Sequence, residues 1–348
     1  MTEILVYGAY GYTGELVVRR AVELGLRPTL AGRDRGKTQA IADHHGLDAR
    51  VFGLDQPEAV RAGLEGMKVV LHCAGPFAQT SQPMVDACLA TGTHYLDITG
   101  EMMVFERCAA QSAEAAAAGV MLMPGVGFDV VPSDCLAAHL AARLPDADHL
   151  QLGFRGLGGG LSHGTATTMI QNLGAPNFVR ADGRLTPVPL GAHTREIDFG
   201  RGPTHCMAIP WGDVSTAWTT TRIPNIEVYV PVPRSAAVAA KIGGKLPWLL
   251  GSDLVKRLAQ KRVDAAPPGP SDAQRAKGKT LVWGRVSNPS GAAVEARLET
   301  PEGYTLTAMT AVAIAERVLA GEAEPGFRTP AGRFGPDFIL GFDGVSRS

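Results

Sequence analysis

The feature that most constrains this chain is a glycine-rich turn directly after its first apolar run. Residues 4–7 are apolar and lead into the segment Gly8-Ala9-Tyr10-Gly11-Tyr12-Thr13-Gly14. Gly8 permits a tight exit from a strand, Gly11 lets a pyrophosphate approach the backbone, and Gly14 lets the next helix lie close to the sheet. The segment therefore predicts a strand, a phosphate-binding turn and a helix over 12–25, whose N-terminus favours phosphate.

The end of the second predicted strand indicates which dinucleotide this turn holds. The apolar run at 28–32 is followed by Arg33, where an NAD site usually has an acid for the ribose 2′-hydroxyl. A guanidinium suits a 2′-phosphate, so we expect NADP, with Lys37 as a second phosphate contact. Asp34 has two possible roles, the NAD acid or the N-cap of the helix that follows it.

Length and composition exclude several classes of protein. A chain of 348 residues is long enough for two domains, and its net charge of -1 without a Lys/Arg block argues against nucleic-acid binding. We expect no transmembrane segment. We also expect no signal peptide, because the chain begins with a strand. Five scattered cysteines without a C-x-x-C pair predict reduced thiols, no metal site and a cytoplasmic protein.

Strands and helices alternate over about 130 residues, which is typical of an α/β fold. Helices are expected at 80–91 and 102–118, and near Pro132 or Ser133. Such units predict a Rossmann-type, doubly wound parallel sheet, with ligands at the carboxyl ends of its strands. The strands are expected at 3–7, 28–32, 49–54, 68–73, 93–98 and 119–124.

Three later strand ends carry further candidate residues. After the fourth strand, Cys73-Ala74-Gly75-Pro76-Phe77 either passes beneath a cofactor or is a plain turn closed by proline. After the fifth strand, Tyr95 and Asp97 share one face and Gly100 is a further candidate cofactor contact, while Thr99 and Glu101 could begin a helix. The sixth strand leads into a glycine-rich run that contains Asp129.

These motifs, in this order, resemble the saccharopine dehydrogenase-like oxidoreductases, and most of all the branch that includes the bacterial trans-acting enoyl reductases. The resemblance covers the first 135 residues and resumes more loosely at 303–308 and 329–331. It implies a two-domain reductase and does not identify a substrate. The runs that carry it are Gly8 to Gly14, Ala31 to Arg33, Ala74 to Phe77, Tyr95 to Glu101 and Gly127 to Asp134.

The second half of the chain predicts a second, mixed α+β domain. Asp182-Gly183 is a turn signal between two β-like runs, and further strands are expected at 215–222, 226–232, 279–287 and 292–299. We expect an NADP-binding domain at 1–133, a substrate and dimerisation domain at 134–302, and a C-terminal helix and tail at 303–348 that return to the first domain. The mixed sheet is compatible with a homodimer.

Two segments of this half leave alternatives open. Ser162-His163 follows a glycine-rich loop, so His163 could be a proton donor, or Ser162 could simply cap a helix beside a solvated histidine. The segment 235–262 is apolar and also carries one tryptophan and six basic residues. These are Trp248 and Lys241, Lys245, Lys256, Arg257, Lys261 and Arg262. It could meet a membrane or a lipid-like substrate, although Pro247 and the pair Gly243-Gly244 interrupt it and a solvated basic face is more common.

Hydride transfer needs an oriented cofactor and, for a C=C or C=N bond, a proton donor. The candidate donors are Tyr95, Asp97, Asp129 and His163, and Asp97 and Asp129 could equally hold loop backbones in place. We expect an NADPH-dependent oxidoreductase that reduces an enoyl-type double bond of an acyl or hydrophobic metabolite. The alternatives are a C=N reductase or dehydrogenase of the amino-acid type and a dinucleotide-binding sensor without catalysis.

Overall fold

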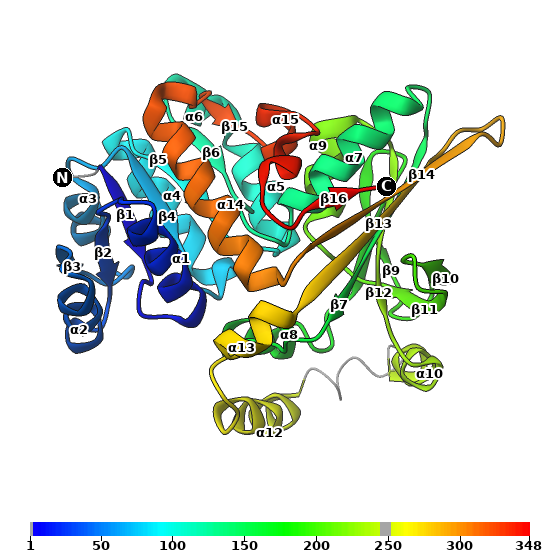
Figure 1. Ribbon diagram of the computed structural model, residues 1–348, viewed down its shortest axis with the longest axis horizontal. Coiled ribbons are helices and arrows are strands. Elements are labelled where there is room, and N and C mark those ends of the chain that lie inside the picture. The colour runs from blue at the N-terminus through cyan, green and yellow to red at the C-terminus, as the bar shows by residue number, and fades with distance from the viewer. Residues whose placement is uncertain (1–2, 244–251) are drawn as a thin grey trace. The chain divides into compact units, whose positions relative to one another are not determined.

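The computed structural model describes residues 3–243 and 252–348, and its contacts divide the chain into two compact units (Figure 1). The first unit contains Met1–Val131 and Tyr304–Arg333, and the second contains Pro132–Gly303 and Phe334–Ser348. The chain thus leaves the first unit after its sixth strand and returns to it near its end. Each unit is built around one sheet.

The first sheet is parallel, and its strand order is β15-β6-β5-β4-β1-β2-β3. The order reverses between β1 and β4, the position at which doubly wound sheets bind ligands. All six predicted strands are present, and a two-residue seventh strand comes from the end of the chain. The strands are β1 Ile4–Tyr7, β2 Thr29–Gly32, β3 Ala49–Val51, β4 Val69–His72, β5 His94–Asp97, β6 Met121–Met123 and β15 Gly326–Phe327.

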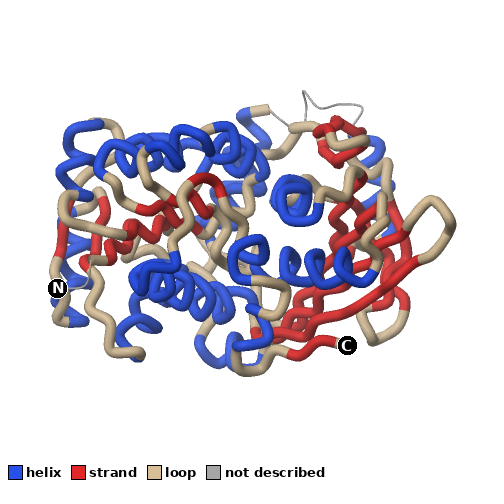
Figure 2. Tube along the Cα trace, turned by 90° about the horizontal axis from the view of Figure 1, so that it is seen from above, coloured by secondary structure: helices blue, strands red, loops and turns tan. Residues whose placement is uncertain are grey.

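Helices cover both faces of this sheet, as Figure 2 shows. Strands β1, β2 and β4 are buried at every position, because apolar side chains on both faces are covered. The predicted helix at 102–118 is divided at Gln111, and α4 begins three residues earlier than expected. The helices are α1 Tyr12–Glu23, α2 Arg35–His45, α3 Pro57–Leu64, α4 Phe77–Thr91, α5 Met102–Ala110, α6 Ser112–Ala117 and α14 Gly303–Arg317.

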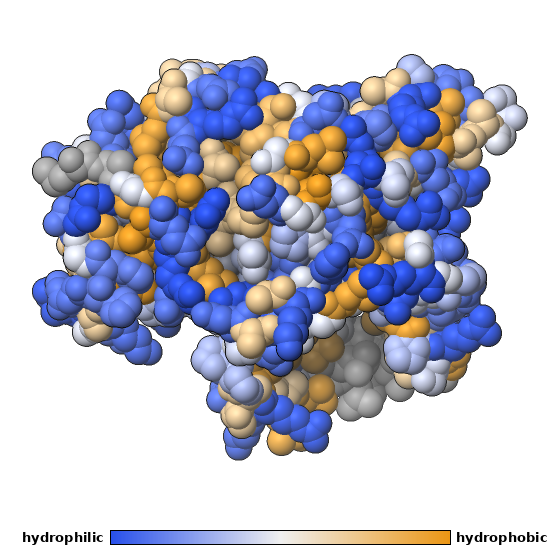
Figure 3. Space-filling model, in the orientation of Figure 1, coloured by the Kyte–Doolittle hydropathy of each residue, from blue (hydrophilic) through white to orange (hydrophobic). Residues whose placement is uncertain are grey.

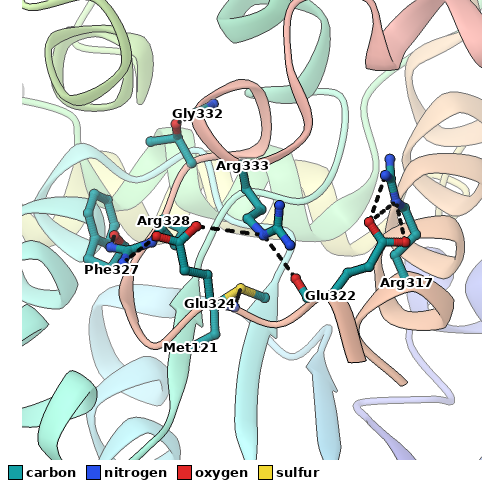
Figure 4. Close-up of polar contacts among 9 residues, drawn as sticks. Met121, Arg317, Glu322, Glu324, Phe327, Arg328, Gly332 and Arg333 are labelled. Atoms are coloured by element: carbon teal, nitrogen blue, oxygen red, sulfur yellow. Dashed lines mark hydrogen bonds and ion pairs between the residues drawn. The ribbon is translucent and has the colours of Figure 1, made fainter. Parts of the chain in front are cut away.

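A network of charged side chains joins different parts of the returning segment, residues 317–333, to one another (Figure 4). Arg317 binds Glu322 through both carboxylate oxygens, and Arg333 donates to the Glu322 carbonyl at 2.9 Å. Glu324 pairs with Arg328 at 2.8 Å and with Arg333 at 3.7 Å. These ion pairs enclose the turn before β15, which pairs with β6 in parallel.

The second sheet is mixed, with the order β10-β11-β12-β7-β13-β14-β16, and β8 and β9 form a hairpin beside β12. The hairpin turns at Asp182-Gly183, as the sequence predicts, and both residues have positive φ. The strands are β7 His149–Leu157, β8 Asn177–Ala181, β9 Arg184–Val188, β10 Thr194–Asp198, β11 Pro203–Ala208, β12 Asn225–Pro231, β13 Lys279–Ser287, β14 Ala293–Pro301 and β16 Ser346–Arg347.

The two faces of the second sheet are covered differently. On one face, Gly284 leaves room for Leu136 and Leu140, so that this part of the sheet lies close to α7. On the other face, Trp283 belongs to a small apolar cluster with Ile197 of β10. The helices of this unit are α7 Val131–Arg143, α8 His163–Gln171, α9 Asp213–Thr221, α10 Arg234–Gly243, α12 Asp253–Asp264 and α13 Asp272–Lys277.

Two predictions for this half are wrong. Residues 215–222 are expected to be a strand, but they lie in α9, where Thr216, Thr219 and Thr221 donate their hydroxyls to carbonyls four residues earlier. These bonds make β-branched threonines compatible with a helix. The tail after residue 333 does not return to the first unit, because β16 pairs with the edge of the second sheet at β14.

The basic segment 235–262 is described only in part. Lys245, Pro247 and Trp248 lie outside the described residues, and helices α10 and α12 flank that gap. Among the described residues, no helix combines the length and the apolar character that a membrane span needs.

Candidate functional site

The glycine turn after β1 is shaped by close contacts that exclude side chains. A Cβ at Gly14 would lie 2.2 Å from the carbonyl oxygen of Gly8, and a Cβ at Gly8 would lie 2.8 Å from the Cβ atom of Ala74. Gly8 also has a φ of +83°, which L side chains rarely adopt. The backbone of the turn therefore lies against both its own helix and the end of β4. Helix α1 begins at Tyr12, so its positive dipole end lies beside the turn.

Ala9, Tyr12 and Thr13 are further predicted cofactor contacts in this turn, and their surroundings differ from those of the glycines. Ala9 is fully buried, and the ring of Tyr12 packs edge-on against Tyr304 of α14, with 5.1 Å between ring centroids. Thr13 lies one residue further along the first turn of α1. These contacts show that the returning helix α14 supports the N-terminus of α1.

The end of β2 lies beside the ring of Tyr10 and is followed by two cations, Arg33 and Lys37. The ring of Tyr10 lies over Gly32, since a Cβ there would be 2.4 Å from its Cε1 atom, and the Lys37 ammonium lies 5.9 Å from the ring centroid. Arg33 is exposed and makes no hydrogen bond or ion pair with any other residue that the structure describes. Asp34 accepts a hydrogen bond from the backbone N–H of Lys37 at 3.0 Å, and is thus the N-cap of α2.

Glu101 supplies an anion to the N-terminus of α4. Its two carboxylate oxygens accept hydrogen bonds from the backbone N–H groups of Phe77 and Ala78, at 2.7 and 2.8 Å. This carboxylate therefore occupies the positive end of that helix. Burial raises the pKa of Glu101, and the two backbone hydrogen bonds oppose that shift. Ala74, Gly75 and Pro76 form the turn before α4, as predicted, and Thr80 donates its hydroxyl to the Ala74 carbonyl at 2.6 Å.

Asp97 is fully buried at the end of β5 and joins two strand ends. One of its oxygens accepts from the N–H groups of Thr99 and Gly125, at 3.0 and 2.8 Å, and the other accepts from the Tyr95 hydroxyl at 2.6 Å. Burial raises the pKa of Asp97 to about 6, against the effect of these hydrogen bonds. The hydroxyl of Tyr95 is buried and occupied, which favours a structural role for this predicted proton donor.

Asp129 lies beside the predicted cofactor contact Gly100. A Cβ at Gly100 would be 2.6 Å from a carboxylate oxygen of Asp129, so this side chain packs directly on the glycine backbone. Burial raises the pKa of Asp129 to about 7, and the negative charge of Glu101 adds to the shift. A carboxyl group that changes charge near neutral pH can donate a proton or accept one. Asp129 is therefore suited to acid–base chemistry at the carboxyl edge of this sheet.

Helix α14 holds the loop that carries Asp129. Thr307 accepts a hydrogen bond from the N–H of Phe128 at 3.0 Å, and Thr310 donates its hydroxyl to the Val126 carbonyl at 2.8 Å. Gly127 fits against Thr307, where a Cβ would lie 2.8 Å from the threonine methyl group. The position of Asp129 thus depends on residues almost two hundred positions away in the sequence.

Comparison with known proteins agrees with this geometry. The family model described as "Saccharopine dehydrogenase NADP binding domain" matches residues 4–123. This part of the chain is similar to the NADP-binding domain of that family. The saccharopine dehydrogenase (L-Glu forming) of Saccharomyces cerevisiae has the same fold, with a TM-score of 0.64, 14% identity and 99% of each chain covered.

Curated relatives of this saccharopine dehydrogenase-like chain come from mycobacteria. A protein of Mycobacterium tuberculosis (strain ATCC 25618 / H37Rv), named provisionally as a trans-acting enoyl reductase, is 27% identical over 72% of this chain and 62% of its own length. The trans-acting enoyl reductase of Mycobacterium leprae is 33% identical over 41% of this chain and 36% of its own length. The chain thus spans less than two thirds of the length of these relatives.

The fourth predicted proton donor, His163, belongs to the second unit. Ser162 caps α8 by accepting a hydrogen bond from the Thr165 N–H, as one of the two predictions for this segment states. The His163 ring nitrogen Nε2 lies 2.8 Å from the Ala266 carbonyl oxygen, within hydrogen-bond distance. Its ring therefore links α8 to the loop after α12. Among the described residues, no group of histidine, cysteine or acidic side chains could hold a metal ion.

The role of Glu101 is the main feature of the site that sequence reasoning missed. The sequence places it after β5, where a capping role at the following helix is the simplest prediction. Its backbone does begin α5, but its side chain caps α4 instead, 24 and 23 positions away in sequence. One signal could have indicated this role: Glu101 follows strand β5, and the neighbouring strand β4 is followed by a helix whose N-cap is Pro76. An acid beside such a helix N-terminus is stabilised there.

We predict that Tyr95→Phe lowers the free energy of unfolding by about 1 kcal/mol, because one buried hydrogen bond to Asp97 is lost. Asp97→Ala should cost more, about 3 kcal/mol, since three donors lose their acceptor. Urea unfolding of both variants measures these differences. Once a substrate is found, a Tyr95→Phe enzyme with a turnover reduced a hundredfold or more at unchanged stability would contradict the structural role.

Proposed function

We propose that this chain is an NADPH-dependent oxidoreductase that reduces an activated carbon–carbon double bond in an acyl or other hydrophobic metabolite. The observation that carries the proposal is the carboxyl group of Asp129, whose pKa is raised to about 7, at the carboxyl edge of a sheet that belongs to an NADP-binding family. A reductase of this kind needs both a dinucleotide and a proton donor.

The residues of the first unit fit NADP. Gly8 and Gly14 have no room for a side chain, so the turn lies close to Ala74 and to α1, and Gly11 adds no side chain where a pyrophosphate would approach the backbone. Arg33 and Lys37 are exposed cations at the end of β2 that would hold the 2′-phosphate. Asp34 is already the N-cap of α2, which leaves the arginine as the residue that selects between the two dinucleotides.

The chemistry divides between cofactor and protein. When bound, a reduced nicotinamide supplies a hydride to the β-carbon of an α,β-unsaturated acyl group. Electron density then builds up on the α-carbon and its carbonyl, and a proton must arrive to complete the saturated product. The protonated carboxyl of Asp129 donates this proton and becomes a carboxylate, which recovers a proton from solvent. Glu101 keeps the carboxyl of Asp129 protonated to a higher pH than burial alone would.

The choice of an enoyl substrate rests on the names of the mycobacterial relatives, two of which are trans-acting enoyl reductases. Asp129 could serve the reduction of a C=N bond in the same way, so the two chemistries must be separated by experiment.

Arg33→Gln is expected to weaken NADPH binding by about tenfold to a hundredfold, because a charge-assisted contact to the 2′-phosphate is lost, and to leave NADH binding unchanged. Fluorescence titration of both dinucleotides measures the preference. The matched control is Arg61→Gln, an exposed arginine on α3, which should change neither affinity.

Two further variants test the same assignment. Gly11→Val should abolish binding of both dinucleotides, since a side chain there fills the phosphate turn. Asp34→Ala should leave the preference for NADPH intact, as it removes only a helix cap. An unaltered preference in Arg33→Gln, or loss of NADH binding alone in Asp34→Ala, would overturn the role given to Arg33.

The proposed reaction is tested by following NADPH oxidation with matched panels of enoyl, imine and keto compounds. We expect turnover of enoyl thioesters or related activated alkenes. Turnover confined to imines would replace the proposal with a C=N reductase of the amino-acid type. Tight NADPH binding without turnover of any panel would favour a dinucleotide sensor.

Asp129→Asn should reduce turnover by roughly 100- to 10,000-fold, the usual contribution of a general acid. In the unaltered enzyme the rate should fall as pH rises above about 7, because the carboxyl that donates the proton becomes ionised. Glu101→Gln removes the neighbouring negative charge, which lowers the pKa of Asp129 and should move this decline to lower pH. A rate profile that is the same in all three proteins would exclude Asp129 as the donor.

A further inference from the structure

Helices α8 and α12 of the second unit form a pair in which no residue is buried. Helix α12 lies along α8, with a hydrogen bond of 3.1 Å from Gln260 to the Thr167 hydroxyl and one of 2.8 Å from Lys256 to the Gln171 carbonyl. The α8–α12 pair, defined as residues 161–171 and 253–264, is therefore a largely solvent-accessible layer in spite of its apolar content.

This pair concentrates exposed apolar side chains. Of the nine large apolar side chains that are exposed among the described residues, four belong to it. Leu254 is 68% exposed and Leu258 is 56% exposed, and they are one helical turn apart on α12. Leu161 and Met169, each 57% exposed, lie in the part of the pair that contains α8, residues 161–171. An apolar concentration of this kind on a surface indicates an interaction site.

The leucines of α12 are flanked by cations. Arg257, Lys261 and Arg262 are exposed, and the helical period of 3.6 residues places Leu254 and Leu258 between Lys261 on one side and Arg262 on the other. The acidic residues of the helix, Asp253 and Asp264, stand at its two ends. Figure 3 shows hydrophobic and hydrophilic surface side by side over α12, at the lower edge of the view.

We propose that the α8–α12 pair docks on an anionic lipid surface. The leucines of α12 would enter the boundary between headgroups and acyl chains, while the three cations contact lipid phosphates and carboxylates. This inference does not depend on the reaction that the first unit carries out. It assigns a surface role to a part of the chain that hydride transfer does not use.

The composition of the pair favours lipid over a protein partner. Protein interfaces are enriched in aromatic side chains and depleted of lysine, and their strongest contacts are mostly Trp, Tyr and Arg. The pair contains no Phe, Tyr or Trp, and α12 carries Lys256 and Lys261. Leucines bordered by lysine and arginine on a helix of mixed character are typical of interfacial helices.

The test is co-sedimentation of the full chain with phosphatidylcholine vesicles, with and without about one third phosphatidylserine. We expect binding to the anionic vesicles that is roughly a hundredfold stronger than to neutral ones and that falls as salt is added. Leu254→Glu/Leu258→Glu and Arg257→Glu/Lys261→Glu should each abolish it. Because these side chains are exposed, the variants should fold, which circular dichroism and NADPH titration check.

Matched controls place the same changes elsewhere. Leu24→Glu, at an exposed leucine of the first unit, and Arg201→Glu, at an exposed arginine of the second, should bind vesicles as well as the unaltered chain. The proposal fails if the unaltered chain does not bind anionic vesicles, or if controls and α12 variants lose binding equally. Absence of vesicle binding together with retention of an acidic protein on α12 would point to a protein partner and would equally overturn the lipid proposal.

Discussion

A single buried carboxylate, that of Asp97, organises the carboxyl edge of the first sheet. It accepts hydrogen bonds from both sides of a gap between two strand ends, from Thr99 after β5 and from Gly125 after β6. Its backbone carbonyl accepts a third bond across the same gap, from Val126 at 2.7 Å. The loops that carry Glu101 and Asp129 begin only a few residues beyond these anchors. Without Asp97, the loops that carry both acids would lose these anchors at the strand ends.

The anchored acids then act on each other through charge. Glu101 is held at the N-terminus of α4 by two backbone N–H groups, and its negative charge helps to raise the pKa of Asp129. A helix dipole thus stabilises one carboxylate, and that carboxylate in turn favours the protonated form of its neighbour. The arrangement separates the roles of two similar side chains by environment alone, the principle by which proteins obtain acids that work near neutral pH.

Local chemistry made most of the first unit predictable, since glycines, apolar runs and a helix cap are read from neighbouring residues. The strands, the tight glycine turn after β1 and the N-cap at Asp34 all belong to this class. Residues brought together over long separations were not predictable: the Glu101 cap of α4, the support of Phe128 by Thr307, and the pairing of β16 with β14. Helix α9 was missed for another reason, because threonine favours strands until its hydroxyl finds a carbonyl within the helix.

The late origin of strand β15 has a consequence for biosynthesis. The first sheet is extended by Gly326 and Phe327, and its Asp129 loop is braced by Thr307 and Thr310. All of these residues leave the ribosome after residues 132–303, the main part of the second unit, have been made. The first unit therefore remains incomplete while the segment inserted into it is synthesised. During that interval the edge of β6 has no neighbouring strand and must avoid aggregation. A chain truncated before residue 303 would lack the parts that complete its own first domain.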